Sequence, residues 1–126
     1  MEKLSPAMED YLKNICLLSG PGAEDIVHVS ELALRMGVSK ACASRATNTL
    51  SEKGLIWKSK YQGVSLNSEG RERAGALLRR HSTLRRFFSE ILRVDPAVAD
   101  KDACKVEHSL SAESYRSICD YLENAR

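Results

Sequence analysis

A stretch near the end of the sequence, DACKVEHSLS, carries a thiol, a carboxylate and an imidazole within five positions. At about 100° per residue, Glu107 and His108 each lie within about 60° of Cys104 around a helix, so the three side chains would share one face. A thiolate, a carboxylate and an imidazole that converge form a mixed ligand set for a first-row divalent ion. Spacing alone leaves open the alternative, a buried thiol beside a solvated acid and imidazole.

Two further residues are candidates to complete the coordination of such an ion, because three ligands rarely fill the shell of a transition metal. Asp10 and His81 lie on segments that must pack against the end of the chain. Asp10 is also explained as an acid favoured in the first turn of a helix, and His81 as an imidazole on a helix surface. Sequence spacing does not bring either residue to the thiol.

Capping residues and breakers divide the chain into short helices, without a repeat or a long linker. Ser5, Ser30 and Ser39 are placed to cap helices, while Gly37 and Gly54 are placed to end them. The chain is therefore expected to be mostly helical. The predicted helices cover residues 6–19, 31–36, 40–53, 69–92, 96–99 and 112–125, with another that starts at Asp102.

Two of these helices, joined by a tight turn around Gly37, predict a helix-turn-helix. Strand-like runs at 55–58 and 64–66 directly after it predict a small hairpin, the wing. The sequence therefore predicts a mainly α chain, with a winged helix-turn-helix DNA-binding domain over residues 1–68 and a helical domain over residues 69–126.

The net charge of +2 hides an uneven distribution along the chain. The central segments 35–66 and 67–93 carry +5 and +4, whereas 1–34 and 94–126 carry −4 and −3. A basic block of this kind indicates a surface that faces polyanions. The alternatives are an ordinary solvated face, or a winged helix that binds another protein.

The amino-terminal turn of the second helix in a helix-turn-helix presents its side chains to the major groove. Arg45 is the candidate for a base edge, because a guanidinium can bond guanine O6 and N7 together. Lysines and polar residues of the wing would contact phosphates and make binding fall with salt. The predicted DNA-binding residues are Ser39, Lys40, Ala41, Cys42, Ser44, Arg45, Lys58, Lys60, Tyr61 and Gln62.

Composition limits the class of protein. A chain of 126 residues, 43% hydrophobic, can bury one core or two small subdomains. Because it has no apolar run of about 18 residues and no secretory signal, we expect a cytoplasmic protein without a membrane partner. The four cysteines include no C-x-x-C pair, which argues against a disulfide framework and against a thiolate-only zinc site.

Nearly the whole chain resembles the diphtheria-toxin-repressor family, the metal-dependent repressors that include manganese transport regulators. The resemblance is carried by SPAMEDYL, VSELALRMGVSKACASRATNTLSEKGLI, KYQGVSLNSEGRERA, LLRRHSTLRRFF and VDPAVADKDACKVEHSLS. The chain is similar to the short members, which lack an additional SH3-like domain. This resemblance implies a homodimer that binds palindromic operator DNA when metal is loaded, with a dimerisation and metal-sensing domain after the wing and no small organic ligand.

The resemblance also implies a set of metal ligands. The family's metal positions fall here on Asp10, His81, Cys104, Glu107 and His108. Cys104 is similar to iron-responsive members and Asp10 to manganese-responsive ones, so Fe(II) or Mn(II) is the expected signal, although Zn(II), Co(II) or Ni(II) can bind such donors. Members with a second metal have ligands at positions that match Lys13, Arg85 or Asp100. Because charged Lys13 and Arg85 cannot ligate a cation, we expect one metal per subunit.

Three other functions are alternatives. A metal-independent winged-helix regulator, sensing a small molecule or redox state through its cysteines, would bind DNA in the presence of chelators. A metalloenzyme centred on Cys104 would need a nucleophile, a base and a substrate pocket, for which the sequence has no pattern, so we expect no enzymatic activity. A protein-interaction module would not be displaced from its partner by palindromic DNA at moderate salt.

Overall fold

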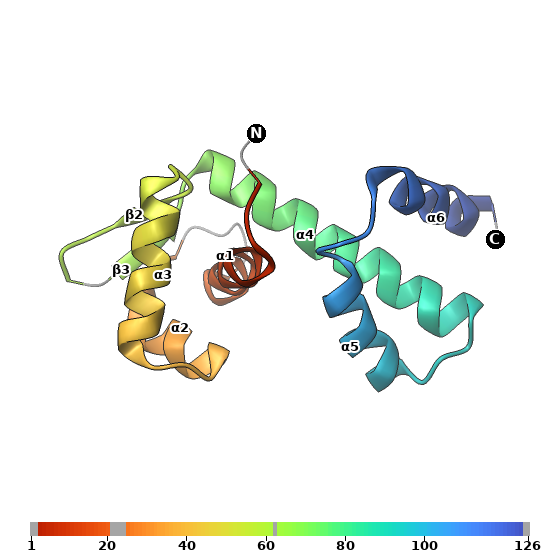
Figure 1. The fold of residues 1–126 in the computed structure, drawn as a ribbon, viewed down its shortest axis with the longest axis horizontal. Coiled ribbons are helices and arrows are strands. Elements are labelled where there is room, and N and C mark those ends of the chain that lie inside the picture. Colours follow the sequence, from red (N-terminus) through yellow and green to blue (C-terminus); the bar gives the residue numbers. More distant parts are fainter. Residues whose placement is uncertain (1–2, 21–24, 62, 125–126) are drawn as a thin grey trace. The chain divides into compact units, whose positions relative to one another are not determined.

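The computed structural model describes residues 3–20, 25–61 and 63–124, and its fold is drawn in Figure 1. The chain forms two compact units, residues 1–75 and 76–126. The helices are α1 Pro6–Leu18, α2 Val29–Met36, α3 Lys40–Glu52, α4 Ser68–Arg86, α5 Pro96–Val106 and α6 Ala112–Asn124. The strands are β1 Val27–His28, β2 Ile56–Lys58 and β3 Gly63–Leu66, and η2, Phe87–Ile91, is a π-helical turn.

Side chains at the starts of α1 and α3 satisfy backbone N–H groups that have no acceptor within the helix. Ser5 Oγ accepts from the Met8 N–H at 3.2 Å, and Ser39 Oγ accepts from the Cys42 N–H at 3.0 Å. Gly37 ends α2 with a φ of 68°, a left-handed conformation that glycine adopts without steric cost. These three features were predicted from the sequence and are confirmed.

Helix α2 begins earlier than the sequence predicts. Val29 is already helical and His28 is the N-cap, so the prediction that Ser30 caps this helix is wrong. The His28 backbone N–H donates to Glu31 Oε1 at 3.2 Å, which brings a carboxylate to the first turn. The reason is tertiary, because His28 pairs with Gly63 in the sheet and the chain passes directly from that strand into the helix.

A three-stranded antiparallel sheet supports the wing, in the order β1-β3-β2. The predicted hairpin is confirmed, with Ile56 opposite Leu66 across β2 and β3. The sequence did not predict β1, whose Val27 lies opposite Val64 of β3. Two residues are too few to show the alternation of a strand, so β1 leaves no pattern in the sequence. Its pairing ties the segment before α2 to the wing.

The core of the first unit is formed by α1, α2, α3 and the sheet. Each of the three helices buries one apolar stripe, including Leu12 of α1 and Leu32 of α2. The inward positions predicted for α3 are all buried: Ala43, Ala46, Thr47 and Leu50. Because these are mostly small residues, α3 can lie close to its neighbours while its opposite face stays in solvent.

Helix α5 is one continuous helix where the sequence predicts two. Asp95 caps it as predicted, with its carboxylate accepting from the Ala97 N–H at 3.1 Å. The predicted second start at Asp102 is wrong, since Asp102 lies inside the helix. No breaker precedes Asp102, and the buried Ala99 and Ala103 continue one apolar stripe past it.

Helix α4 crosses the division between the two units, and its carboxy-terminal end widens into η2. The Leu92 N–H donates to the Phe87 carbonyl at 3.1 Å, five residues back, before Arg93 turns the chain with a φ of 61°. The predicted domain boundary after residue 68 falls in the first turn of α4 and stays a prediction. Ala125, the last residue of the final predicted helix, lies outside the described residues. Within the described ranges, no helix is long and apolar enough to cross a membrane.

The first turn of α4 lies against Leu55, the residue just before β2, and we expect Gly70→Ala to destabilise the protein. A Cβ at Gly70 would meet the Leu55 carbonyl oxygen closer than real Cβ contacts allow. The backbone must therefore shift, at a cost of about 1–3 kcal/mol in the free energy of unfolding. Urea denaturation would measure it, with Glu72→Ala on the exposed side of α4 as control. Equal stability of the two variants would show that this close packing is absent.

Candidate metal centre and nucleic-acid surface

Three candidate metal ligands converge in the carboxy-terminal unit. One potential ligand atom from each of His81, Cys104 and Glu107 lies within 4.8 Å of the other two. Metal bonds of about 2.0–2.3 Å keep the ligands of a tetrahedral site within roughly 4 Å of one another. Small side-chain movements would therefore bring the imidazole, the thiolate and the carboxylate onto one ion.

Two elements position these side chains. His81 lies on α4, whereas Cys104 is on the last turn of α5 and Glu107 is the C-cap of that helix. Residues three apart on a helix share a face, so the thiol and the carboxylate point the same way. Helix α5 packs against η2, the continuation of α4, and this packing brings that face to His81.

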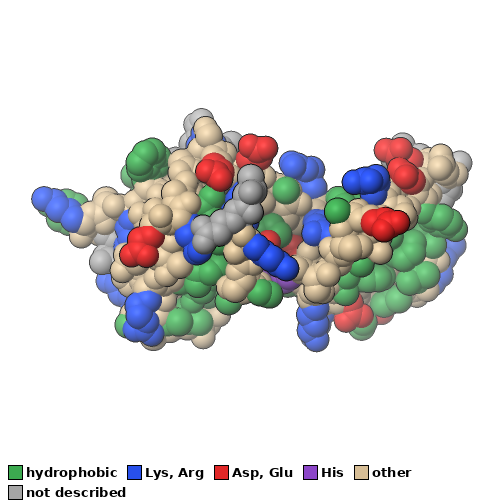
Figure 2. Space-filling view, turned by 45° about the horizontal axis from the view of Figure 1, so that its top comes forward, with side chains coloured by type: hydrophobic (Ala, Val, Ile, Leu, Met, Phe, Trp, Pro, Cys, Tyr) green, Lys and Arg blue, Asp and Glu red, His purple; other side chains and the backbone are tan. Residues whose placement is uncertain are grey.

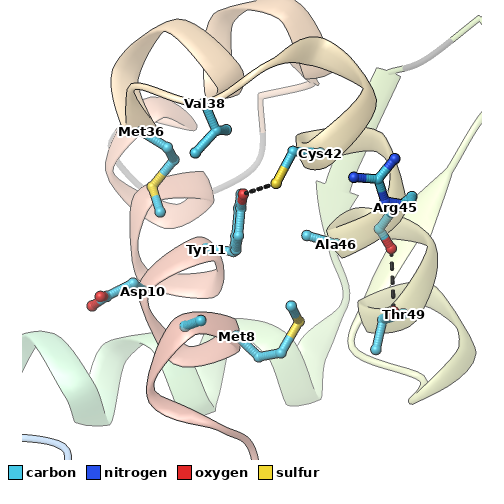
Figure 3. A pocket seen from close by; sticks show the side chains of 10 residues that line it. Met8, Asp10, Tyr11, Met36, Val38, Cys42, Arg45, Ala46 and Thr49 are labelled. Atoms are coloured by element: carbon cyan, nitrogen blue, oxygen red, sulfur yellow. Dashed lines mark hydrogen bonds between the residues drawn. The ribbon is translucent and has the colours of Figure 1, made fainter.

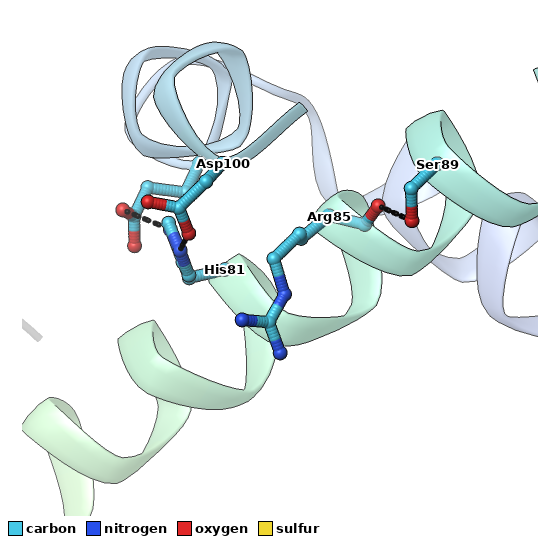
Figure 4. A network of polar contacts seen from close by, with 5 residues as sticks. His81, Arg85, Ser89 and Asp100 are labelled. Atoms are coloured by element: carbon cyan, nitrogen blue, oxygen red, sulfur yellow. Dashed lines mark hydrogen bonds and ion pairs between the residues drawn. The ribbon is translucent and has the colours of Figure 1, made fainter. Parts of the chain in front are cut away.

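The carboxylate of Glu107 is buried, with 0% of the residue exposed to solvent. Its Oε1 lies 3.3 Å from His81 Nδ1, and Asp100 Oδ1 lies 2.8 Å from His81 Nε2 (Figure 4). An ionised carboxylate away from water requires hydrogen bonds or positive charge. The imidazole between two carboxylates, with a thiol nearby, is therefore an environment suited to a divalent cation.

The other two predicted ligands are outside this cluster. Helix α5 ends at Val106, and His108 lies in the turn that follows. The helical-face argument therefore applies to Cys104 and Glu107 only, and ligation by His108 stays a prediction. Asp10 lies on α1 in the amino-terminal unit, and its part in the site also stays a prediction.

Asp100 is the residue of this region that pattern reasoning from the sequence missed, since it entered only as a position matched to a second metal. It lies four residues before Cys104 and seven before Glu107, a spacing that places all three on one face of α5. That spacing was visible in the sequence. What was not visible is that its partner is His81, because no local pattern joins α4 to α5.

The predicted DNA-binding side chains of α3 divide by exposure. Ser39, Lys40, Ala41 and Arg45 are exposed, whereas Cys42 and Ser44 are half-buried. In the wing, Lys60 and Tyr61 are exposed, with Lys60 Nζ 5.4 Å from the centre of the Tyr61 ring, and Gln62 lies outside the described residues. The exposed set has the cationic and small polar side chains that contact with DNA requires.

Lys58 ties the wing to α3. Its ammonium donates to the Ser44 carbonyl at 3.0 Å, to Ser44 Oγ at 3.1 Å and to Asn48 Oδ1 at 2.8 Å. Burial lowers the pKa of Lys58, because the charged ammonium loses hydration. The predicted contact of Lys58 with phosphate stays a prediction. The structure also gives Lys58 a structural role, because its hydrogen bonds hold β2 beside α3, the recognition helix of the helix-turn-helix.

Helix α1 is joined to both helices of the helix-turn-helix. Tyr11 Oη lies 3.5 Å from Cys42 Sγ of α3, and Arg35 Nε of α2 donates to Asn14 Oδ1 at 2.7 Å. Beside the Tyr11 contact is a largely apolar surface pocket of about 470 Å³, which the Cys42 side chain also lines (Figure 3). Tyr11, the residue after Asp10 on α1, therefore contacts the first turn of α3 directly.

An apolar groove of about 370 Å³ lies on the surface of the carboxy-terminal unit, between η2 and α6. Figure 2 shows hydrophobic side chains gathered on this unit. The Phe87 and Tyr121 rings meet edge to face with their centres 6.2 Å apart, and Tyr121 is 55% exposed. The groove is lined by Phe87, Ile91, Leu92, Ser117, Ile118 and Tyr121. An exposed apolar patch of this kind suits contact with another protein surface.

A winged helix-turn-helix followed by a helical unit with clustered metal ligands defines a class of metal-responsive transcriptional regulators. Residues 3–64 match the family model of the iron-dependent repressor N-terminal DNA-binding domain. Residues 67–126 match the iron-dependent repressor metal-binding and dimerisation domain. The chain belongs to the iron-dependent repressor family, whose members are transcriptional regulators. The predicted resemblance and fold class are thereby confirmed.

Individual relatives agree with this assignment. An uncharacterized HTH-type transcriptional regulator of Methanocaldococcus jannaschii is 30% identical over 120 residues, 95% of each chain. A manganese-dependent transcriptional repressor in complex with manganese is 32% identical, with a TM-score of 0.81 over 92% of this chain and 52% of that chain. The manganese regulator SloR is 27% identical, with a TM-score of 0.79 over 95% of this chain and 55% of that chain. The chain thus spans about half the length of these two solved regulators.

The contact between α1 and α3 predicts an unusual titration of Tyr11. Burial, together with the hydrogen bond to Cys42, raises the pKa of Tyr11 from its ordinary value to about 12. A raised pKa means that the neutral hydroxyl stabilises the fold below about pH 10, and that this stability is lost as the pH rises towards 12. The difference in tyrosinate absorbance between the wild type and Tyr11→Phe should develop near pH 12. A difference already half developed at pH 10, as for an ordinary tyrosine, would contradict a buried hydroxyl.

Proposed function

We propose that this protein represses the transcription of metal-homeostasis genes by binding palindromic operator DNA as a homodimer when it is loaded with Fe(II) or Mn(II). The observation that carries the proposal is the convergence of His81, Cys104 and Glu107 in a chain whose other unit is a winged helix-turn-helix. Membership in the iron-dependent repressor family supports it, since that family joins a DNA-binding domain to a metal-binding and dimerisation domain.

The residues that would hold the metal are those of the cluster together with two from the sequence analysis: Asp10, His81, Cys104, Glu107 and His108. Their donors fit a first-row divalent ion, since thiolate and imidazole favour Fe(II), Co(II), Ni(II) or Zn(II), while carboxylates also accept Mn(II). We assign one ion to each subunit, because Lys13 and Arg85 put cations where ligands of a second ion would be needed. A bound ion would supply positive charge and a fixed point shared by its ligands.

The amino-terminal unit can pass a constraint on α1 to the recognition helix. Asp10 is next to Tyr11, which contacts Cys42 in the first turn of α3, and Asn14 one turn further on holds Arg35 of α2. Fixing Asp10 would therefore fix α1, and α1 would carry both helices with it. In the metal-free protein the carboxylates and the thiolate repel one another, so the DNA-binding units would be free to take other positions.

At the operator, the first turn of α3 would enter the major groove and the wing would follow the phosphate backbone. Arg45 is exposed and has the donors to read a guanine, while the exposed Lys40 and Lys60 would contact phosphates. In a dimer, two recognition helices would meet half-sites about one helical turn, roughly 34 Å, apart. The apolar groove between η2 and α6 supports dimerisation through the carboxy-terminal unit.

Anaerobic titration of metal-free protein with Fe(II) or Mn(II) tests the proposal. We expect one tight equivalent per chain in the wild type and a loss of affinity in His81→Ala and Cys104→Ser. That loss should exceed the about 10–100-fold that removal of a ligand's supporting partner typically causes. Asp102→Ala, which removes an exposed acid from α5, is the control. Two tight equivalents in the wild type, or unchanged affinity in both ligand variants, would refute the assigned site.

Asp10 provides a test of the coupling between metal and DNA. We expect Asp10→Ala and His108→Ala to lose metal-dependent binding to the operator while remaining dimers, because neither residue lines the apolar groove between η2 and α6. The probe is a palindromic duplex selected from random DNA by the Mn(II)-loaded wild type, and binding is measured with and without the ion at fixed salt. Chelator-resistant binding by the wild type would favour a metal-independent regulator, and wild-type affinity in both variants would contradict the coupling.

A further inference from the structure

The contact between Asp100 and His81 has a chemical consequence for the metal centre. Asp100 Oδ1 lies 2.8 Å from Nε2 of His81, on the edge of the ring away from Nδ1. His81 Nδ1 lies 3.3 Å from Oε1 of the buried Glu107. The two ring nitrogens of His81 thus have different environments, one facing a half-exposed carboxylate and the other facing the candidate ligands (Figure 4).

We propose that Asp100 is a positioning residue that fixes the tautomer and the ring orientation of His81, so that Nδ1 is the nitrogen that ligates the metal. The inference rests on the proposed function, because it assumes that His81 is a ligand. An ionised carboxylate can only accept a hydrogen bond, so the short contact requires the proton of a neutral imidazole to be on Nε2. Nδ1 then carries the lone pair, and that lone pair is directed at the side of the ring where Glu107 lies.

The helix that supplies Asp100 also supplies two of the ligands. Asp100, Cys104 and Glu107 follow one another at spacings of four and three residues on α5, so they project from one face. His81 on α4 is therefore held by the same face that it would join in binding the ion. Carboxylates or carbonyls that accept from the free N–H of a ligating histidine make it more basic and orient it, which strengthens metal binding.

The same geometry argues against Asp100 as a ligand of a second ion. Its Oδ1 is engaged with His81, and Asp100 is not among the three residues whose ligand atoms converge. Arg85 of α4, four residues after His81, is exposed and bears no ligand group (Figure 4). Asp100 therefore occupies the position of a ligand in family members with a second metal. In this chain, its contact with His81 gives it the role of positioning that imidazole instead.

The first experiment measures metal affinity without DNA. Competition with a fluorescent chelator for Co(II) or Zn(II) is carried out on the wild type, Asp100→Ala, Asp100→Asn and the control Asp102→Ala. We expect Asp100→Ala to bind about 10–100-fold more weakly. Asp100→Asn should bind more tightly than Asp100→Ala, since its amide oxygen can still accept from Nε2–H, and the control should match the wild type. Thermal unfolding of the metal-free variants identifies any loss of fold.

The second experiment identifies which ring nitrogen of His81 carries the proton and which binds the metal. A merely structural role of Asp100 would predict no preference between the two nitrogens. In Zn(II)-loaded protein labelled with ¹⁵N-histidine, the His81 Nε2 should carry the proton and Nδ1 should be metal-bound. A metal-bound Nε2, unchanged affinity in Asp100→Ala, or a wild type that binds two equivalents of which Asp100→Ala loses one, would each overturn the inference. His81→Ala and Cys104→Ser separate the two proposals: if these bind metal normally, the site itself is wrong, and if only Asp100→Ala does, the positioning role alone is wrong.

Discussion

The packing of the carboxy-terminal unit has to satisfy a fully buried carboxylate, that of Glu107. Glu107 has no solvent exposure, and a carboxylate removed from water must be met by hydrogen bonds or positive charge. His81 Nδ1 faces this carboxylate from α4 at 3.3 Å, and Asp100 of α5 contacts Nε2 on the other edge of the same imidazole. The packing of α5 along α4 and η2 is thus fixed at a polar centre as well as through apolar contact. That centre has the donors from which a divalent ion is held.

In the amino-terminal unit, α1 is the helix to which both helices of the helix-turn-helix are attached. Tyr11 and Asn14 attach this helix to α3 and α2, and Lys58 attaches the wing to α3. The two helices of the helix-turn-helix are therefore held together with α1, the helix that carries Asp10, by side-chain hydrogen bonds. For a regulator this matters, because a local constraint on α1 becomes a constraint on the whole DNA-binding surface.

Local rules predicted much of this fold. Ser39 and Asp95 are caps whose oxygens accept from N–H groups two or three positions on, and Gly37 takes the left-handed conformation that ends a helix. Such features depend on a few neighbouring residues, so they are visible in the sequence. Two of the misses, strand β1 and the start of α2, have a common cause. Strand β1 exists only because β3 lies beside it, and α2 begins at Val29 because that strand leads into it.

For the metal centre, the sequence by itself determined the types of donor and the shared helical face of Cys104 and Glu107, because both follow from residue identity and the 100° rotation per residue. Only the tertiary structure decided which nitrogen of His81 faces those donors and that Asp100 holds the other one. It also decided that α5 ends before His108. The physical reason is that α4 and α5 meet through packing, and packing between distant segments leaves no local pattern in either of them.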